Sequence, residues 1–96
     1  MPKVEKQKVE KQTFTFEAWP VGTVLHIPKS DKFEKVWHVE TIAVWDFLYG
    51  SNGLDAYCYI APRGGQDYVE FAAADVCFLT TAEAQSECDK RNGGGK

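Results

Sequence analysis

The sequence has no long apolar run and only three cysteines. Its apolar stretches are a few residues long, too short for a transmembrane helix, and its lysine- and glutamate-rich start has no apolar signal-peptide core. We therefore expect a cytoplasmic protein that does not enter a membrane. The cysteines are odd in number and widely spaced, and they form no C-x-x-C motif or zinc-ligand pair. This pattern predicts reduced thiols that are buried as small apolar side chains.

Signals for catalysis are also missing. An enzyme needs a nucleophile beside a base, paired carboxylates or a metal cluster, and none of these stands out by spacing. His26 and His38 lie in predicted strands without evident partners. The glycines at 64–65 and 93–95 lack the strand–loop–helix setting of a phosphate-binding loop. We predict a non-enzymatic protein with no metal and no cofactor.

Basic side chains are scarce in the part of the chain that can fold. Residues 13–89 contain twelve acidic and four basic side chains, a formal charge of −8, whereas both ends of the chain are cationic. Three of the four bases, Lys29, Lys32 and Lys35, share one predicted loop. An acidic body repels phosphate groups, so its charge favours a protein partner with a basic surface over nucleic acid.

The 96-residue length allows one domain with one modest core, which an aromatic content of 14% can fill. Residues 3–12 read KVEKQ twice, with too few apolar groups for burial. We predict a disordered segment over residues 1–12, or an arm that orders on a partner, then a folded domain over residues 13–91. A flexible glycine-rich end follows at residues 92–96.

Strands and turns dominate the central part of the chain. The alternation Thr-Phe-Thr-Phe-Glu at 13–17 predicts a strand with Phe14 and Phe16 on one face. Asn52-Gly53 and Gly64-Gly65 each predict a two-residue hairpin turn, because both central positions of a type I′ turn need positive φ. Further strands are predicted over residues 22–27, 36–47 and 76–79.

The two predicted turns set a register for three strands, with Phe47 opposite Cys58 and Cys58 opposite Phe71. One face then becomes the predicted apolar face, with Trp45, Phe47, Cys58, Ile60, Val69 and Phe71. The opposite face carries tyrosines edged with carboxylates: Asp46, Tyr57, Tyr59, Tyr68 and Glu70. Tyrosine is enriched at protein interfaces, so we take this tyrosine face as the candidate contact surface, with Trp19 and Trp37 as further candidates. In a closed barrel several of the tyrosines would instead belong to the core.

The end of the chain predicts a helix. Thr80 and Glu83 have the spacing of a capping box, and the helix should run to about residue 91, before Asn92 and three glycines. Five short strands, tight turns and this helix predict a mainly β fold, a small, partly open barrel of the SH3-like type, with an α+β roll as the alternative.

Three segments carry a resemblance to known proteins. They are Gly22-Thr23-Val24, Trp37-x-Val39 and Phe78-Leu79-Thr80-Thr81-x-Glu83-Ala84. In this order they make residues 13–90 similar to small SH3-like β-barrel proteins of bacterial prophages and other mobile elements. The resemblance implies a fold and a genomic origin, and it assigns no site residues.

These observations together predict a non-enzymatic protein-binding module. Its sharpest form is a phage or mobile-element inhibitor whose acidic, tyrosine-rich face docks on a basic host or defence protein. One alternative is a small barrel that binds nucleic acid through aromatics and the lysine loop or tails. Another is a self-associating structural protein, in which an edge strand at 13–17 or 76–79 pairs with its copy. The predicted state is a monomer or a homodimer.

Overall fold

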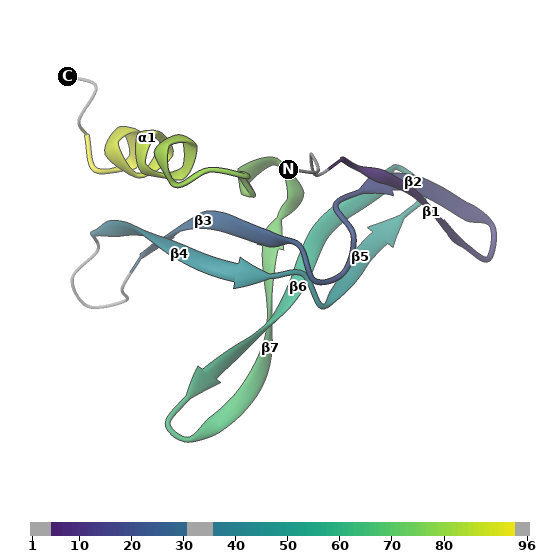
Figure 1. The fold of residues 1–96 in the computed structure, drawn as a ribbon, viewed down its shortest axis with the longest axis horizontal. Coiled ribbons are helices and arrows are strands. Elements are labelled where there is room, and N and C mark those ends of the chain that lie inside the picture. Colours follow the sequence, from purple (N-terminus) through teal and green to yellow (C-terminus); the bar gives the residue numbers. More distant parts are fainter. Residues whose placement is uncertain (1–4, 31–35, 94–96) are drawn as a thin grey trace.

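The computed structural model describes residues 5–30 and 36–93. It is mainly β with one C-terminal helix, as predicted, but it has seven strands in three open antiparallel sheets where we predicted five strands in a partly open barrel (Figure 1). The described residues form no closed barrel. The elements in chain order are β1 (Gln7–Lys11), β2 (Phe14–Ala18), β3 (Val24–Ser30), β4 (Trp37–Ala43), β5 (Asp46–Gly50), β6 (Gly53–Arg63), β7 (Gln66–Ala73), η1 (Ala74–Val76) and α1 (Thr81–Arg91).

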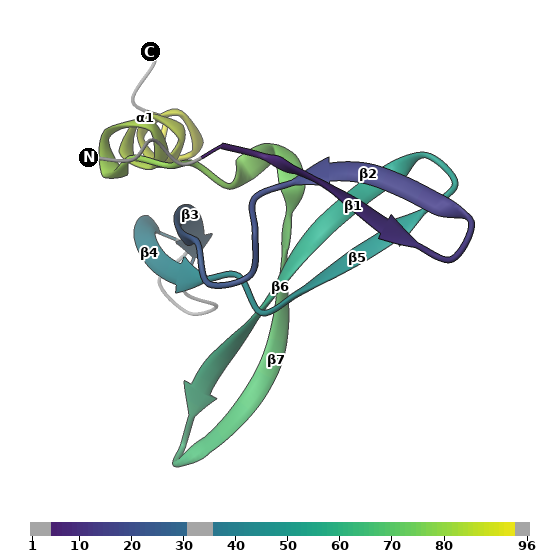
Figure 2. The ribbon, with the colours of Figure 1, turned by 45° about the vertical axis from the view of Figure 1, so that its right-hand side comes forward.

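Each sheet is built from strands that are neighbours in the sequence. β1 pairs with β2, β3 pairs with β4, and β6 lies between β5 and β7. The β3–β4 hairpin packs between α1 on one face and β6 on the other, while β2 packs on β6 nearer the β5–β6 turn. Figure 2 shows the end of the β6–β7 hairpin projecting away from the other elements.

The core lies between these sheets and collects side chains from all three of them. The buried side chains at its centre are Phe16, Ala18, Leu25, Ile27, Ile42, Tyr57 and Tyr59. Phe16 stacks on Tyr49 with ring centroids 5.2 Å apart and meets Phe47 edge-on at 5.6 Å. The prediction that Phe14 and Phe16 share one face is confirmed, because both rings contact Tyr49.

The register of the second predicted hairpin is confirmed and that of the first is wrong. Gly64 and Gly65 have φ of 58° and 85°, and the ladder pairs Cys58 with Phe71 as expected. In the first hairpin Gly50 pairs with Gly53, so the turn is Ser51-Asn52 instead of Asn52-Gly53.

A bulge accompanies this shifted turn. Leu48 pairs with Ala56 and Tyr49 pairs with Leu54, which leaves Asp55 as an extra residue on β6. As a result Phe47 lies opposite Tyr57, one residue away from the predicted Cys58.

This sheet buries part of the predicted contact face and exposes most of the predicted apolar face. Tyr57 and Tyr59 are 1% and 2% exposed and belong to the core, whereas Phe71 on the predicted apolar face is 58% exposed. The two tyrosines can be buried without an unpaired hydroxyl, because each hydroxyl has a hydrogen-bond partner. The Trp19 N–H donates to Tyr57 Oη at 2.9 Å, and Lys29 Nζ donates to Tyr59 Oη at 2.9 Å.

The N-terminal repeat is ordered where the structure describes it. Residues 7–11, which lie in the segment predicted to be disordered or to order on a partner, form β1; this strand pairs with β2 and places half-buried Val9 against the core. A single apolar residue is enough here because the strand also gains backbone hydrogen bonds along β2. The first described strand therefore begins at residue 7, and residues 1–4 lie outside the described part of the chain.

The C-terminal helix is confirmed. The Glu83 N–H donates to Thr80 Oγ1 at 3.2 Å, and Ala84 and Cys88 are buried on the side of α1 that packs on β3 and β4. Asn92 ends the helix and belongs to the fold, whereas we predicted a flexible end from residue 92. Residues 94–96 lie outside the described part.

Two predicted strands take another form. The single long strand predicted over residues 36–47 is broken at residues 44–45 into β4 and β5. Of the strand predicted over residues 76–79, only Phe78 pairs, through an isolated bridge to His26. Of the two segments predicted as edge strands for self-association, residues 14–18 form β2, which pairs only with β1, and residues 76–79 form no strand.

Candidate interaction surface

Large apolar side chains gather on one solvent-facing side of the β5–β6–β7 sheet, which we name the outer face. Its exposed apolar members are Trp45, Leu48, Ile60, Val69 and Phe71, between 41% and 58% exposed. The ladder places them together: Ile60 pairs with Val69, and Leu48 lies on the same side as Cys58, the partner of Phe71. Single exposed apolar residues are ordinary on a protein surface, but a contiguous group on one sheet face marks a contact site.

Trp45 joins the outer face through a local irregularity. Its N–H donates to the Cys58 carbonyl at 2.8 Å, although Asp46 is the ladder partner of Cys58. Two consecutive residues therefore lie opposite one, as in a β-bulge. Trp45 and Asp46, both exposed, thus lie opposite Cys58 at one border of the outer face.

The charged residues of the outer face are acidic. Asp46 on β5 and Asp67 on β7 lie on the same side as Cys58 and Ile60, and both are exposed. The Phe47 N–H donates to Asp46 Oδ1 at 2.8 Å, which orients that carboxylate. The one basic residue of the three strands, Arg63, lies on the other side of the sheet. The outer face therefore offers apolar area bordered by negative charge.

Glu70, one of the predicted contact residues, is bound by two basic side chains. Arg63 donates to it through Nε at 2.9 Å and Nη2 at 2.8 Å, and Lys29 Nζ from β3 also binds Glu70 Oε1. Hydrogen bonds from Arg63 and Lys29 lower the Glu70 pKa to about 2. Burial opposes the charge of Lys29, yet hydrogen bonds to Glu70 and Tyr59 raise its pKa. This group of four residues joins β3 to β6 and β7 and leaves Glu70 neutralised.

The residues predicted to form one contact stripe are divided among different environments. Tyr57 and Tyr59 are core residues, and Tyr68 is half exposed on the inner side of β7, where its hydroxyl donates to Gln66 at 2.7 Å. Of the predicted contact residues only Asp46 lies on the outer face, together with Trp45, Ile60, Val69 and Phe71 from the predicted apolar face.

Both tryptophans named as further candidates make internal contacts. Half-buried Trp19 packs against the core, with Lys6 Nζ 5.4 Å from its ring centroid. The Arg91 guanidinium carbon lies 4.5 Å from the centroid of the Trp37 ring. The Trp37 backbone N–H donates to Asn92 Oδ1 at 2.9 Å, and Asn92 Nδ2 donates to the Trp37 carbonyl at 3.0 Å. Trp37 thus holds the end of α1 on β4.

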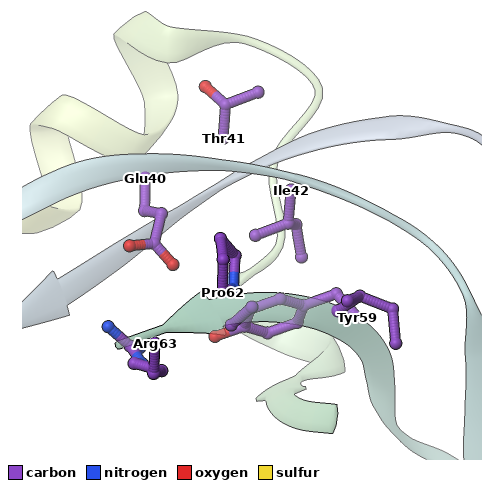
Figure 3. A pocket seen from close by; sticks show the side chains of 8 residues that line it. Glu40, Thr41, Ile42, Tyr59, Pro62 and Arg63 are labelled. Atoms are coloured by element: carbon purple, nitrogen blue, oxygen red, sulfur yellow. The ribbon is translucent and has the colours of Figure 1, made fainter. Parts of the chain in front are cut away.

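A small pocket of about 190 Å³ lies between β4 and β6. Glu40 and Arg63 face each other across it, and Ile42, Tyr59 and Pro62 form its walls (Figure 3). Ile60 also lines it, so the pocket adjoins the outer face. Its Arg63 and Tyr59 are already bound to Glu70, which leaves the pocket few free polar groups for a ligand of its own.

The thiols and acidic groups of the described residues do not form a metal site. In residues 5–30 and 36–93 no three histidine, cysteine or acidic side chains are placed to hold a metal ion. All three cysteines are buried free thiols. Burial and then Asp75 raise the pKa of Cys77 to about 12, so this thiol stays protonated at neutral pH.

No protein-family model matches this sequence, and no curated protein or solved structure matches the chain. The similarity to SH3-like proteins of mobile elements therefore stays a prediction. No helix in the part of the chain that the structure describes is long and apolar enough to cross a membrane.

Proposed function

We propose that this protein is a non-enzymatic protein-binding module and that the outer face is its contact surface. The observation that carries the proposal is the set of five large apolar side chains, 41% to 58% exposed, on one face of one sheet. The center of an interface is typically apolar and aromatic and its border polar, and the outer face has this composition. Trp45 and Phe71 are its largest side chains and the expected main contributors to affinity.

The charge of the outer face supports a partner with a basic surface. Asp46 and Asp67 border the apolar area, and residues 13–89 carry a formal charge of −8. A second copy of the chain would bring the same negative charges to the contact, which disfavours self-association through this face. A phage-type inhibitor that occupies a basic groove of a host or defence protein would have such a surface.

Nucleic-acid binding has less support. Two of the four bases in residues 13–89, Lys29 and Arg63, are bound to Glu70, and the aromatic residues of the outer face stand beside carboxylates. Lys32 and Lys35 of the predicted lysine loop lie outside the described residues. A stacking surface for single strands needs nearby cations, and the described residues of this face include none.

The test is capture of partners from a cell lysate at low salt, with and without nuclease, by wild-type protein and three variants. Phe71→Asp and Asp46→Lys change the outer face, and Asp89→Lys makes the same charge reversal on exposed α1. We expect proteins that are retained by the wild type and by Asp89→Lys and lost from both outer-face variants, with retention that weakens as salt rises. The proposal would be contradicted if the outer-face variants captured the same proteins as the wild type. It would also be contradicted if nuclease treatment removed the captured partners.

A further inference from the structure

β7 is the longest strand that has a free edge. Its eight residues pair with β6 without a register break, and its other side faces no strand among the described residues. Proteins usually protect such an edge with lysine, proline, a bulge or a covering segment. The β7 sequence, QDYVEFAA, has no basic residue and no proline.

Most of the other edges carry protection that β7 lacks, and β2, which pairs only with β1, is an unprotected edge of five residues. β1 has lysines at 8 and 11, and β5 is short and its pairing is bulged at Leu48/Tyr49. The backbone of Trp37 on β4 is occupied by the Asn92 side chain, and β3 is bridged to Phe78 at His26. Among the described strands, β7 is therefore the longest unprotected edge.

Pro62 shows which backbone groups of β7 point to the free edge. Pro62 has no N–H and lies opposite Asp67, so this pair cannot exchange the two hydrogen bonds of a bonded pair. Bonded and non-bonded pairs alternate in an antiparallel ladder. The N–H and carbonyl groups of Asp67, Val69 and Phe71 therefore point away from β6, toward the free edge.

The same three residues carry their side chains on the outer face. A strand added at this edge would thus pair with the backbone of Asp67, Val69 and Phe71 and extend the outer face by one row of side chains. Apolar side chains in that row would cover Val69 and Phe71, and a basic one would meet Asp67. On the inner side the row would lie beside Tyr68 and Glu70, and Glu70 is already neutralised by Lys29 and Arg63.

We propose that the partner binds by adding an extended segment as a fourth strand at the edge of β7. Every second residue of this added segment would lie on the outer face, and these residues carry apolar and basic side chains. The proposal rests on the proposed function and specifies how the partner is held: by main-chain hydrogen bonds to β7 and by side chains on the outer face. The −8 charge of residues 13–89 favours a basic segment over β7 of a second copy.

The probe is a displayed library of nine-residue peptides in which random residues alternate with threonine, selected on the full chain. We expect enrichment of apolar and basic residues at the random positions. The enriched peptide is then synthesised and its Kd is measured for wild type, Val69→Pro and Val69→Thr. Val69→Pro removes one outward N–H and should weaken binding on the order of tenfold, whereas Val69→Thr keeps the N–H and the side-chain shape and should change the Kd less than about threefold.

A second measurement leaves the protein unchanged. N-methylation of alternate peptide residues removes the donors on one side of the strand at a time, so one methylated series should lose binding and the other should keep it. Equal effects of both series would overturn strand addition.

Binding that is lost with Ile60→Asp and unaffected by Val69→Pro and by either methylated series would overturn strand addition while the outer face remained the contact surface. The same library is also selected on the Phe71→Asp variant. If the wild type enriched no peptides beyond those enriched by this variant, both proposals would be overturned. A dimer of the chain at about 0.02 M salt that Val69→Pro dissociates would identify a second copy as the occupant and overturn the basic partner.

Discussion

Tyr57 and Tyr59 contribute to the core with the full area of their rings, because each hydroxyl is satisfied by a group of another element. Phe71 has no such role, since more than half of its side-chain surface faces solvent. The more hydrophobic residue is outside and the more polar ones are inside. Burial in this sheet is decided by which face the other hairpins cover.

The two faces of the sheet should differ sharply in their effect on stability. We expect Tyr57→Ala to lower the free energy of unfolding by about 3–5 kcal/mol, since it opens a cavity in the core. Phe71→Ala should lower it by less than about 1 kcal/mol, because exposed side chains contribute little. Urea unfolding followed by tryptophan fluorescence measures both variants. A larger loss for Phe71→Ala would contradict the assignment of the faces.

Glu70 makes stability depend on acid pH. Its pKa of about 2 in the folded protein is below the usual 4.5, so its contribution is complete above about pH 4.5 and is lost as the pH falls toward 2. Glu70→Gln should therefore destabilise the protein at pH 7 and reduce the difference in stability between pH 7 and pH 3. The control is Asp89→Asn on α1, which should leave that difference unchanged. Urea midpoints at the two pH values give the comparison.

Sequence alternation identifies the two faces of the sheet but cannot choose between them. Tyr57 and Tyr59 alternate with Cys58 and Ile60, and both sets are apolar enough to be buried. The choice depends on where β2 and β3 dock, which is a long-range property. The signal that was available was Arg63: it is the only lysine or arginine between positions 36 and 89, and a lone base in an acidic body indicates an ion pair, here with Glu70.

At the scale of elements, β1 shows how pairing can order a polar segment. Its lysines and Glu10 face solvent or the edge, and Val9 is its single apolar contact with the core cluster. Five residues of composition typical of disorder become a strand because β2 is already fixed by Phe16 and Ala18. A prediction made for one segment at a time cannot include this dependence of β1 on β2.

Val9→Ser should test whether β1 contributes to stability. We expect it to lower the free energy of unfolding by about 1 kcal/mol, because Val9 is half buried against the core. Lys8→Ser, at the neighbouring exposed position, should have an effect within about 0.5 kcal/mol. If both variants matched the wild type in urea unfolding, residues 7–11 would be disordered in solution.

The turns explain which elements could be predicted. Gly64-Gly65 stands alone between two strands, so its register and the pairing of Cys58 with Phe71 follow from the turn type. At the other hairpin Gly50 and Gly53 offer two ways to turn, and the extra residue Asp55 favours the one that the Asn52-Gly53 pattern does not indicate. The capping box at Thr80 is a strictly local signal, and the predicted helix was confirmed.

At the scale of the whole molecule, the negative charge of the body opposes self-association through the apolar outer face. The negative charge of residues 13–89 should keep copies apart at low ionic strength. Salt screens that repulsion, so we expect a monomer at about 0.02 M salt and concentration-dependent self-association at about 0.5 M. Sedimentation velocity at both salt concentrations measures this, and Phe71→Asp should remain a monomer in both. Association that is stronger at low salt would contradict the account.

Every ladder in this molecule closes between strands that are consecutive in the chain, and the bridge from His26 to Phe78 is the exception among the described residues. The hydrogen-bonded units can therefore form over short loops, at little entropic cost, before they meet. What remains for the end of folding is the docking of side chains such as Phe16, Leu25 and Tyr59 from separate units. Each unit should form on its own timescale, and the shared interior should be the last part to become cooperative.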